Sequence, residues 1–270
     1  MKPLFLSVCL LYTLLIQAQR NIRGLIKAEK SFAAYAVAHG TKAAFLHYLD
    51  SAGIIFQQGN FVNGIEAWQL RAPTKGVLNW QPQYAEIAAS HDFGYTTGPW
   101  TFQPNGPQDT VAARGQYITI WHVNKERQWK VLIDLGISNT PVNPVHEVKR
   151  IKAIKWLQPT KDTTILMNTE MVFLIVIDEN VATAYHQFLS ATSILNRNGH
   201  LPALTQHDQE RLIKSTPELS YTVLGSAIAR SGDLGYVYGT TMFKNKQDGY
   251  LRIWRREKEG WKIALEVLRF

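Results

Sequence analysis

The sequence predicts an α+β fold of two tandem domains, each with about three N-terminal helices packed on a curved antiparallel sheet. The first observation is an internal repeat: a shift of 141 positions places residues 29–102 on residues 170–243, so that Glu29 falls on Glu170. The second is that, in each copy, helical periodicity comes first and short alternating strands follow. A repeat of this length is too long for a solenoid unit and indicates one globular domain per copy.

Residues 1–18 read as a secretory signal peptide. Lys2 is followed by an apolar run from Leu4 to Ile16 and then by Gln17 and Ala18, and the run is too short for an ordinary membrane span. We therefore expect export, to a periplasm or to the outside, and no membrane span once the signal is removed. The only cysteine, Cys9, lies in this segment, so the mature chain would have no disulfide and no thiolate metal site.

The first domain is expected over residues 19–136. Apolar residues from Ile22 to Ala36 recur with helical spacing, and Gly40 ends that helix. Thr41 is the candidate N-cap of a second helix, and Asn63 can cap a third. Strands are then expected as an antiparallel meander, over residues 83–90, 93–103, 112–122 and 129–135.

The second domain is expected over residues 166–270, after a linker at 137–165 that has a short helix near 148–156. Residues 171–177 are aliphatic and β-branched enough for a strand, but their match to the first copy's helix favours a helix. Thr205 and Asp208 resemble a capping box that opens the third helix. We expect the two copies to pack against each other as an intramolecular pseudo-dimer. Strands complete this copy, over residues 219–230, 234–243, 249–256 and 261–267.

Two parts of the second copy carry a family resemblance: Ser231-Gly232-Asp233-Leu234-Gly235-Tyr236-Val237-Tyr238-Gly239, and the strand Gly249 to Arg256 followed by Gly260-Trp261-Lys262-Ile263. The first copy matches through Gly94 to Gly98 and through Gly115 to Trp121. These segments resemble the nuclear transport factor 2-like superfamily, in particular its SnoaL-like domains. The resemblance implies a cone-shaped domain in which a curved sheet wraps a long helix and leaves a pocket at its open end. It selects no activity, because this superfamily contains isomerases, dehydratases, cyclases, lyases and noncatalytic binding modules.

The resemblance also implies candidate site residues. Ketosteroid isomerase-like members use a pocket carboxylate as a base and hydroxyl donors to hold an enolate. Asp134 and Glu266, at corresponding places on the last strand of each copy, are the candidates for this catalytic base. Tyr95 and Tyr236 are the matching donors.

A structural role is the alternative for each of these residues. Strand alternation would place Asp134 on the opposite face from Trp129, Val131 and Ile133, where it can pair with a neighbouring Arg or Lys. Indole rings can line a pocket for a flat or apolar ligand, but they also fill the concave core of a curved sheet. This choice applies to four tryptophans, Trp80, Trp100, Trp121 and Trp254.

Several classes of function are disfavoured by the sequence. The histidines show no metal-binding spacing, and there is no phosphate-loop, dinucleotide or Gly-x-Ser-x-Gly motif, so we expect neither a metal nor a cofactor. The formal net charge is +8, but the basic residues are dispersed and belong to no nucleic-acid motif, so no nucleic-acid partner is expected. A basic protein of this kind can instead favour anionic ligands.

The sequence therefore favours an exported protein that binds a small apolar or aromatic molecule in one or both cones. Two alternatives stay open: a cofactor-independent isomerase or dehydratase acting through Asp134 or Glu266, and an envelope scaffold or interaction module. The copies differ at positions such as His91 against Gly232. Such divergence indicates that at most one pocket keeps an original function, without indicating which.

Overall fold

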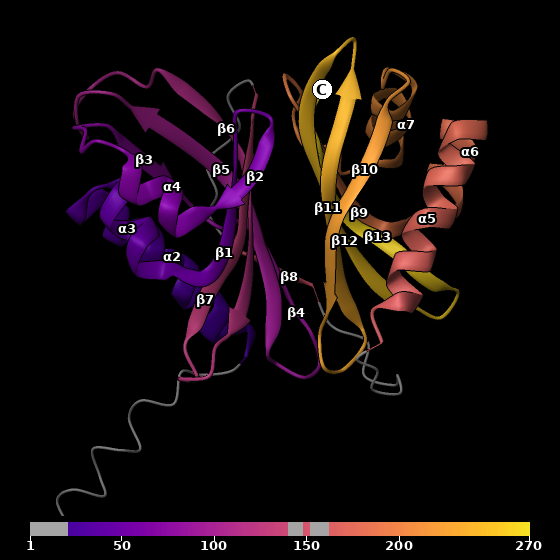
Figure 1. Ribbon diagram of the computed structural model, residues 1–270, viewed down its shortest axis with the longest axis horizontal. Coiled ribbons are helices and arrows are strands. Elements are labelled where there is room, and N and C mark those ends of the chain that lie inside the picture. Colours follow the sequence, from indigo (N-terminus) through magenta and orange to yellow (C-terminus); the bar gives the residue numbers. More distant parts are fainter. Residues whose placement is uncertain (1–20, 140–147, 152–161) are drawn as a thin grey trace, which may run out of the picture.

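The structure is a computed structural model that describes residues 21–139, 148–151 and 162–270. Its described part forms four layers, in which two sheets lie back to back and helices cover the outer face of each (Figure 1). The predicted signal peptide, residues 1–18, and most of the predicted linker lie outside the described residues. No helix in the described ranges is both long enough and apolar enough to span a membrane.

The helices of the first half follow from local sequence signals. They are α2 (Ile22–His39), α3 (Thr41–Tyr48) and α4 (Gly64–Leu70). The Asn21 side chain caps α2 by accepting a hydrogen bond from the backbone N–H of Gly24, at 2.9 Å, and Gly40 ends the helix at a φ of 89°. The predicted cap at Thr41 is wrong, because Gly40 holds the N-cap position and Thr41 is already helical.

The first sheet is mixed rather than wholly antiparallel. Strands β4 to β7 form the predicted antiparallel meander, but β1 pairs with β7 in parallel and β8 pairs with β4 in parallel. The order is β2-β1-β7-β6-β5-β4-β8, with β3 beside β5. The bounds are β1 (Leu49–Gln57), β2 (Asn60–Asn63), β3 (Val77–Trp80), β4 (Tyr84–Ile87), β5 (Phe93–Gln103), β6 (Ala113–Val123), β7 (Trp129–Ser138) and β8 (Lys149–Ile151).

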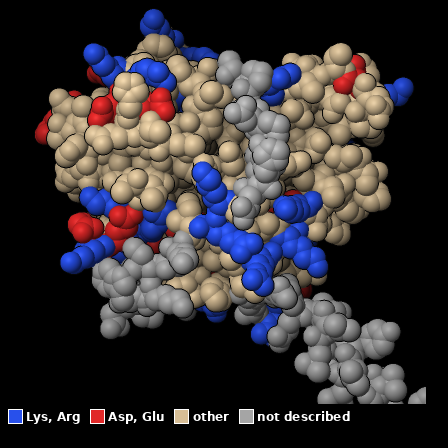
Figure 2. Space-filling view, turned by 180° about the vertical axis from the view of Figure 1, so that it is seen from behind, with Lys and Arg blue, Asp and Glu red and all other residues tan. Residues whose placement is uncertain are grey.

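Strand β8 corrects the sequence prediction for the linker. A short helix was expected near residues 148–156, yet Lys149–Ile151 is a strand on the edge of the first sheet. Lys149 and Arg150 are exposed there. Figure 2 shows Lys and Arg side chains gathered near the middle of the back of the molecule, with Asp and Glu mainly toward its edges. Positive charge of this kind favours the approach of anions.

The second half repeats the plan with fewer strands. Its sheet has the order β10-β11-β12-β13-β9, with β9 and β13 parallel. Residues 171–177 are helical, as predicted, and the Thr205 side chain caps α7 by accepting from the Asp208 N–H. The bounds are α5 (Thr164–Glu179), α6 (Val181–Phe188), β9 (Leu189–Arg197), α7 (Gln206–Lys214), β10 (Ser220–Ile228), β11 (Leu234–Phe243), β12 (Lys246–Glu257) and β13 (Gly260–Leu268).

A β-bulge in each half decides which face the last-strand acid occupies. Ile120 pairs with Ile133 but Trp121 pairs with Val131, so Leu132 is an extra residue in β7. The matching pairs in the second half leave Ala264 as the extra residue in β13. The prediction that alternation separates Asp134 from Val131 is therefore wrong: the bulge returns Asp134 to the helix-facing side.

The two sheets pack on each other through a shared apolar core. It combines residues of β5 to β7 with residues of β9 and β11 to β13, and Phe93 stacks on Tyr236 with ring centroids 5.8 Å apart. Corresponding residues of the two copies also meet here, since the hydroxyl oxygens of Ser90 and Ser231 lie 2.9 Å apart. The paired turns hold Asp92 and Asp233, which link the two halves: Asp92 accepts from Arg230, and Asp233 accepts from the backbone N–H of Ala89.

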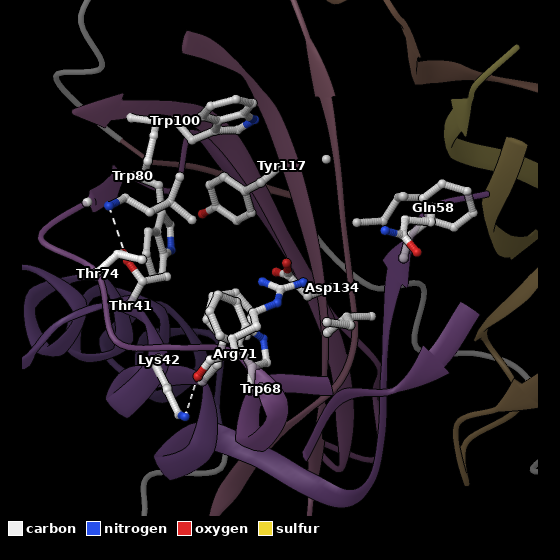
Figure 3. Close-up of a pocket in the computed structure, with 18 of the residues that line it drawn as sticks. Thr41, Lys42, Gln58, Trp68, Arg71, Thr74, Trp80, Trp100, Tyr117 and Asp134 are labelled. Carbon is white, nitrogen blue, oxygen red and sulfur yellow. Dashed lines mark hydrogen bonds between the residues drawn. The ribbon is translucent and has the colours of Figure 1, made fainter. Parts of the chain in front are cut away.

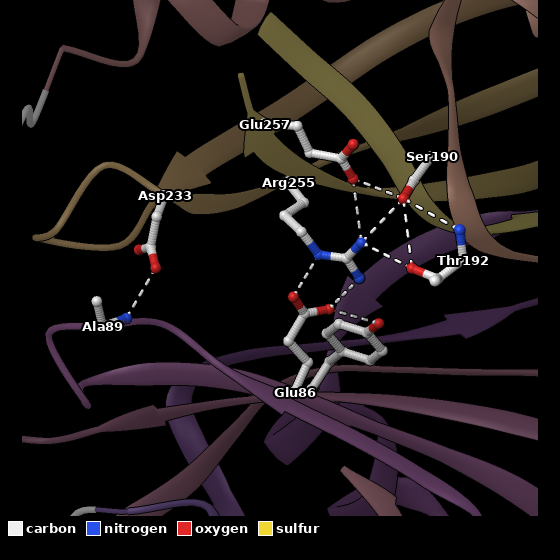
Figure 4. A network of polar contacts seen from close by, with 8 residues as sticks. Glu86, Ala89, Ser190, Thr192, Asp233, Arg255 and Glu257 are labelled. Carbon is white, nitrogen blue, oxygen red and sulfur yellow. Dashed lines mark hydrogen bonds and ion pairs between the residues drawn. The ribbon is translucent and has the colours of Figure 1, made fainter. Parts of the chain in front are cut away.

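A buried ion pair crosses the same interface (Figure 4). The Arg255 guanidinium donates to both Glu86 carboxylate oxygens, at 2.5 and 2.7 Å, and also to Ser190 at 3.0 Å. The Tyr95 hydroxyl donates to Glu86 at 2.9 Å. Both charged groups are almost fully buried, and the cation that pairs with Glu86 comes from the other half of the chain, whereas Arg255 also contacts Glu257 in its own half at 3.2 Å.

Candidate functional site

A cavity of about 1400 Å³ opens in the first half, between its helices and the helix-facing side of its sheet (Figure 3). Helix α3, the end of α4, the segment after it, and strands β1, β3, β5, β6 and β7 line this cavity. The second half supplies part of one wall, through the first residues of β12 and through Arg269. Gln247 fixes that wall by donating to the Gly59 carbonyl at 3.0 Å and to Asn60 at 2.8 Å.

Aromatic side chains form much of the lining. Trp80 on β3 and Trp100 on β5 are opposite each other in the sheet, and both indole N–H groups are satisfied by the protein. Trp80 donates to Glu29 at 2.5 Å and Trp100 donates to the Ile137 carbonyl at 3.2 Å. The rings are thereby held in place and offer apolar surface to a ligand. The other aromatic lining residues are Phe45, Phe56, Trp68, Phe102 and Tyr117.

Asp134 places a carboxyl group in this cavity. Its Oδ2 accepts a hydrogen bond from the Thr119 hydroxyl at 2.9 Å. Burial and the nearby Glu29 charge raise the pKa of Asp134 to about 7, against the lowering effect of the Thr119 bond. The group can therefore accept or release a proton near neutral pH, which is what a general base requires.

Glu29, on α2, lies behind the cavity wall. It is fully buried and accepts hydrogen bonds from Trp80, from Trp121 at 2.8 Å and from the Thr96 hydroxyl. Within the described ranges no Lys or Arg forms an ion pair with Glu29. Burial raises its pKa despite the donors around it. The first half therefore holds two acids, Glu29 and Asp134, without a compensating cation.

Tyr117, which the sequence did not single out, adds a hydroxyl group to the cavity. It lies on β6 two residues before Thr119 and faces the same side. Among the described residues its hydroxyl has no hydrogen-bond partner. Burial, followed by the charges of Glu29 and Asp134, raises the pKa of Tyr117 well above its usual value, so the buried group stays protonated and keeps an unused donor. Its place in the alternation with Thr119 and Trp121 was the only sequence signal for it.

The corresponding space in the second half is filled with charged side chains. Arg252 stands where the first half has Thr119, since each pairs with its own last-strand acid. Arg252 donates to Glu266 at 2.5 Å and to Glu170, and Arg197 donates to Glu266 at 2.6 Å. All four side chains are almost completely buried.

Glu266 is therefore a structural acid rather than a candidate base. Burial alone would raise its pKa, but the charges of Arg197 and Arg252 outweigh that effect and hold the pKa of Glu266 below its usual value. The Tyr185 hydroxyl also donates to it, at 2.8 Å. A carboxylate so fully engaged has no free oxygen for a substrate, and the expectation of a catalytic role for Glu266 is corrected on this ground.

The remaining predicted site residues divide between wall and core. Trp80 and Trp100 line the cavity, as described above. Trp121 and Trp254 are completely buried, and each donates its indole N–H to the first-helix glutamate of its own half. Tyr95 and Tyr236 lie on the opposite face of each sheet, at the interface between the halves. We had expected these four to contact a ligand; they stabilise the fold instead.

No metal site is formed by the part of the chain that the structure describes: no three of its His, Cys, Asp or Glu side chains are grouped as metal ligands. No protein-family profile matches the sequence, and no curated protein matches it.

Solved structures similar to this chain include proteins described as ketosteroid isomerase-like and NTF2-like. A putative ketosteroid isomerase from Parabacteroides distasonis is 17% identical, with 45% of this chain and 90% of that chain covered and a TM-score of 0.34. An NTF2-like protein from Cytophaga hutchinsonii is 17% identical, covering 44% and 98%, with a TM-score of 0.33. An NTF-2 like protein of unknown function from Shewanella oneidensis is 18% identical, covering 42% and 94%, with a TM-score of 0.33.

Proposed function

We propose that this protein binds a small, largely apolar or aromatic molecule in the cavity of its first half. The observation that carries the proposal is a large aromatic-lined space that contains the Asp134 carboxyl group and is bordered by Tyr117, whose buried hydroxyl has no hydrogen-bond partner among the described residues. Ligand sites in proteins are mostly apolar concave spaces with a few placed polar groups. An envelope scaffold, the alternative drawn from the sequence, would be expected to fill both spaces with its own side chains.

The second half serves in this proposal as a structural partner. Its equivalent space is filled by Arg252 and Arg197, and the β12 residues Gln247 and Asp248 complete the wall of the first-half cavity. One half thus carries the ligand site while the other supports it. The chain acts as an intramolecular pseudo-dimer with a single ligand site.

Native mass spectrometry of the purified chain, compared with its denatured mass, tests the proposal. We expect additional mass that is lost on denaturation. Tyr117→Phe removes one hydroxyl from the cavity and should weaken retention of a ligand that bonds to it about fivefold, the value of one ordinary hydrogen bond. Tyr250→Phe, at the corresponding position of the filled half, is the matched control and should leave retention unchanged. Failure of the chain to retain or bind any member of a small-fragment set would contradict the proposal.

A second candidate function is proton transfer next to a carbonyl group, of the isomerase or dehydratase type. The pKa of Asp134, near 7, favours it, because a base works best when its pKa lies close to the working pH. In this scheme Asp134 removes a proton from carbon and the Tyr117 hydroxyl donates to the developing enolate oxygen. Deuterium exchange at the α-carbon of bound cyclic ketones, followed by NMR, tests it. Asp134→Asn should abolish exchange, whereas Asp248→Asn on the same cavity wall should not.

We also propose that the chain is exported, a proposal supported only by the sequence of residues 1–18. The mature N-terminus would then follow Ala18. N-terminal sequencing of the protein recovered from its native envelope or culture medium tests this. A recovered chain that begins at Met1 and stays inside the cell would contradict it.

A further inference from the structure

We infer that the ligand is a carboxylate monoanion whose charge is bound by Arg71, so that the cavity selects aromatic or cyclic monocarboxylic acids. This inference rests on the proposed ligand-binding function and names the ligand class of the same cavity. It depends on which cations line the cavity and on which of them already have partners.

Three of the four Lys and Arg residues that line the cavity are engaged. Lys42 donates to the backbone carbonyls of Gln69 and Arg71, at 2.9 and 2.5 Å. Arg269 donates to Asp248 at 2.6 Å and to a backbone carbonyl, and Lys246 lies 3.8 Å from the same aspartate. None of these three is a strong candidate for binding a ligand anion.

Arg71 is different. Its guanidinium lies over the Trp68 ring, 3.9 Å from the centroid, and donates through Nη2 to the Gln57 amide oxygen at 2.7 Å. Neither contact supplies negative charge. In the described residues Arg71 forms no ion pair, and its Nε and Nη1 have no hydrogen-bond acceptor. Burial lowers the pKa of Arg71, which reflects the cost of removing an unpaired cation from water. An anion in the cavity would offset that cost.

The geometry at Arg71 favours a carboxylate. Lys42 also has no acid partner among the described residues, but two backbone carbonyls already accept from its ammonium, whereas Arg71 keeps free donors on a planar group. Gln57 and Trp68 fix the guanidinium plane, and Gln57 takes only one of the two Nη2 protons. The other Nη2 proton, with the neighbouring Nε or Nη1 proton, leaves one edge of the guanidinium for the paired hydrogen bonds typical of Arg with a carboxylate. Figure 3 shows Arg71 and Asp134 directed into the same space, below the rings of Trp80, Trp100 and Tyr117. A ligand with an acid group at Arg71 and a neutral polar group at Asp134 satisfies both.

Calorimetric titration of the full chain with matched acids and amides tests the inference. The probes are benzoate with benzamide and 2-naphthoate with 2-naphthamide, at neutral pH, where each pair differs in charge but little in shape. We expect each acid to bind about ten- to a hundredfold more tightly than its amide, the range for hydrogen bonds to a charged group. Arg71→Gln should remove this preference while leaving amide affinity unchanged. Arg71→Lys should retain part of it, and serves also if the Gln variant fails to fold.

Lys246→Gln is the control for general electrostatics, because it removes a positive charge from the cavity rim at a residue that already has an acid partner. It should keep the preference for the acid. Equal binding of acid and amide by the unmodified chain would overturn the inference and leave the cavity proposal intact. So would equal loss of preference in Lys246→Gln and Arg71→Gln. Failure of every probe to bind would overturn both proposals.

Discussion

The two halves have an acid at the same two positions, one on the first long helix and one on the last strand. The surroundings of these acids differ between the halves. Among the described residues, Glu29 and Asp134 of the first half have no cationic partner; Asp134 lines the cavity and Glu29 is buried behind its wall. Glu170 and Glu266 in the second half are joined by Arg252 in a filled core. The difference at one β-strand position, Thr119 against Arg252, coincides with the difference between an open cavity and a core filled by ion pairs.

The aromatic residues changed together with the charge. Trp80 pairs with Trp100 in the first sheet, whereas the corresponding residues of the second sheet are Tyr221 and Thr241. Tyr221 lies against the Arg252 guanidinium, at 5.0 Å, as do Phe173 and Tyr250. The rings that would form a ligand surface therefore surround an arginine instead. Cavity and core are two uses of the same concave face.

Arg252→Thr should have the largest effect, because it gives the second half the residue of the first without its cavity lining. The change leaves Glu170 buried without a cation and removes one of two cations from Glu266. Breaking a buried ion pair in this way costs about 3 to 5 kcal/mol. Urea unfolding followed by tryptophan fluorescence measures the loss in free energy of unfolding. Thr119→Ser, which keeps the hydroxyl on Asp134, is the matched control in the first half and should cost less than about 1 kcal/mol. Similar losses in both variants would contradict the comparison.

Glu86→Gln tests the interface that joins the halves and should have the next largest effect. It removes the carboxylate that accepts two hydrogen bonds from Arg255, although Arg255 keeps Glu257 at 3.2 Å as a second acid. We expect a loss of about 2 to 3 kcal/mol, the range for a hydrogen bond to a charged group. The same urea transition measures it.

Arg230→Gln is the control for this prediction. It breaks the other ion pair between the halves, Arg230 with Asp92, in which the arginine is 57% exposed. Surface pairs of this kind contribute about 1 kcal/mol or less. If the exposed pair costs as much as the buried one, burial is not what makes the Glu86 contact important.

Much of the fold could be predicted because its signals are local. Asn63 and Thr205 cap the helices that the sequence assigned to them, and strand β5 has the predicted bounds of Phe93 and Gln103. The repeat was visible in the sequence, but the shift between the copies is not constant. Leu49 corresponds to Leu189, a shift of 140 rather than the 141 found at Glu29, because Leu49 pairs with Val131 as Leu189 pairs with Ile263. A change of one residue in the length of one copy, at a helix end, does not alter the hydrophobic periodicity of either copy, so the sequence pattern does not reveal it.

The candidate site was harder to predict because it depends on contacts between distant segments. The face that Asp134 occupies is set by the bulge at Leu132, which simple alternation does not include. The alternation pattern marks Tyr95 and Tyr236 as buried, but it does not say on which face of the sheet. Both lie on the face that packs against the other sheet, not on the face that carries the helices. Arg71 could be distinguished from the other cations of the cavity only once the partners of all of them were known, and no sequence spacing reveals these partners.

Asp134→Asn should stabilise the protein at neutral pH, while the matched Glu266→Gln should destabilise it. Because the folded-state pKa of Asp134, about 7, lies above its ordinary value, Asp134 contributes stability at low pH and loses it as the pH rises toward 7. We expect Asp134→Asn to gain about 1 to 2 kcal/mol over the unmodified chain above pH 7, after allowing for screening by water in the cavity, and almost nothing at pH 4. Urea midpoints measured from pH 4 to 8 give the two curves.

The control has the opposite sign, since the pKa of Glu266 is held below its ordinary value. Its contribution is present above the unfolded-state pKa and is lost as the pH falls. The difference between Glu266→Gln and the unmodified chain should therefore shrink toward low pH. A pH-independent effect for Asp134→Asn would show that its carboxyl titrates as an ordinary surface group, and the case for a base in this cavity would fail.

The smallest expected effect concerns a position at which the first half has a partly exposed Asp–His contact and the second half has a buried hydrogen bond from an arginine to a serine. Asp50 lies 2.8 Å from the His122 ring, and the corresponding residues of the second half are Ser190 and Arg255. Burial opposes the shift, but the Ala52 N–H and the His122 ring lower the pKa of Asp50. Its contribution is therefore present at neutral pH and is lost as the pH falls through the lowered pKa. Asp50→Asn should cost less than about 1 kcal/mol at pH 7, because both partners are partly exposed. A loss as large as that of Glu86→Gln, measured in the same urea series, would mean that this pair stabilises the first half as strongly as Arg255 stabilises the interface.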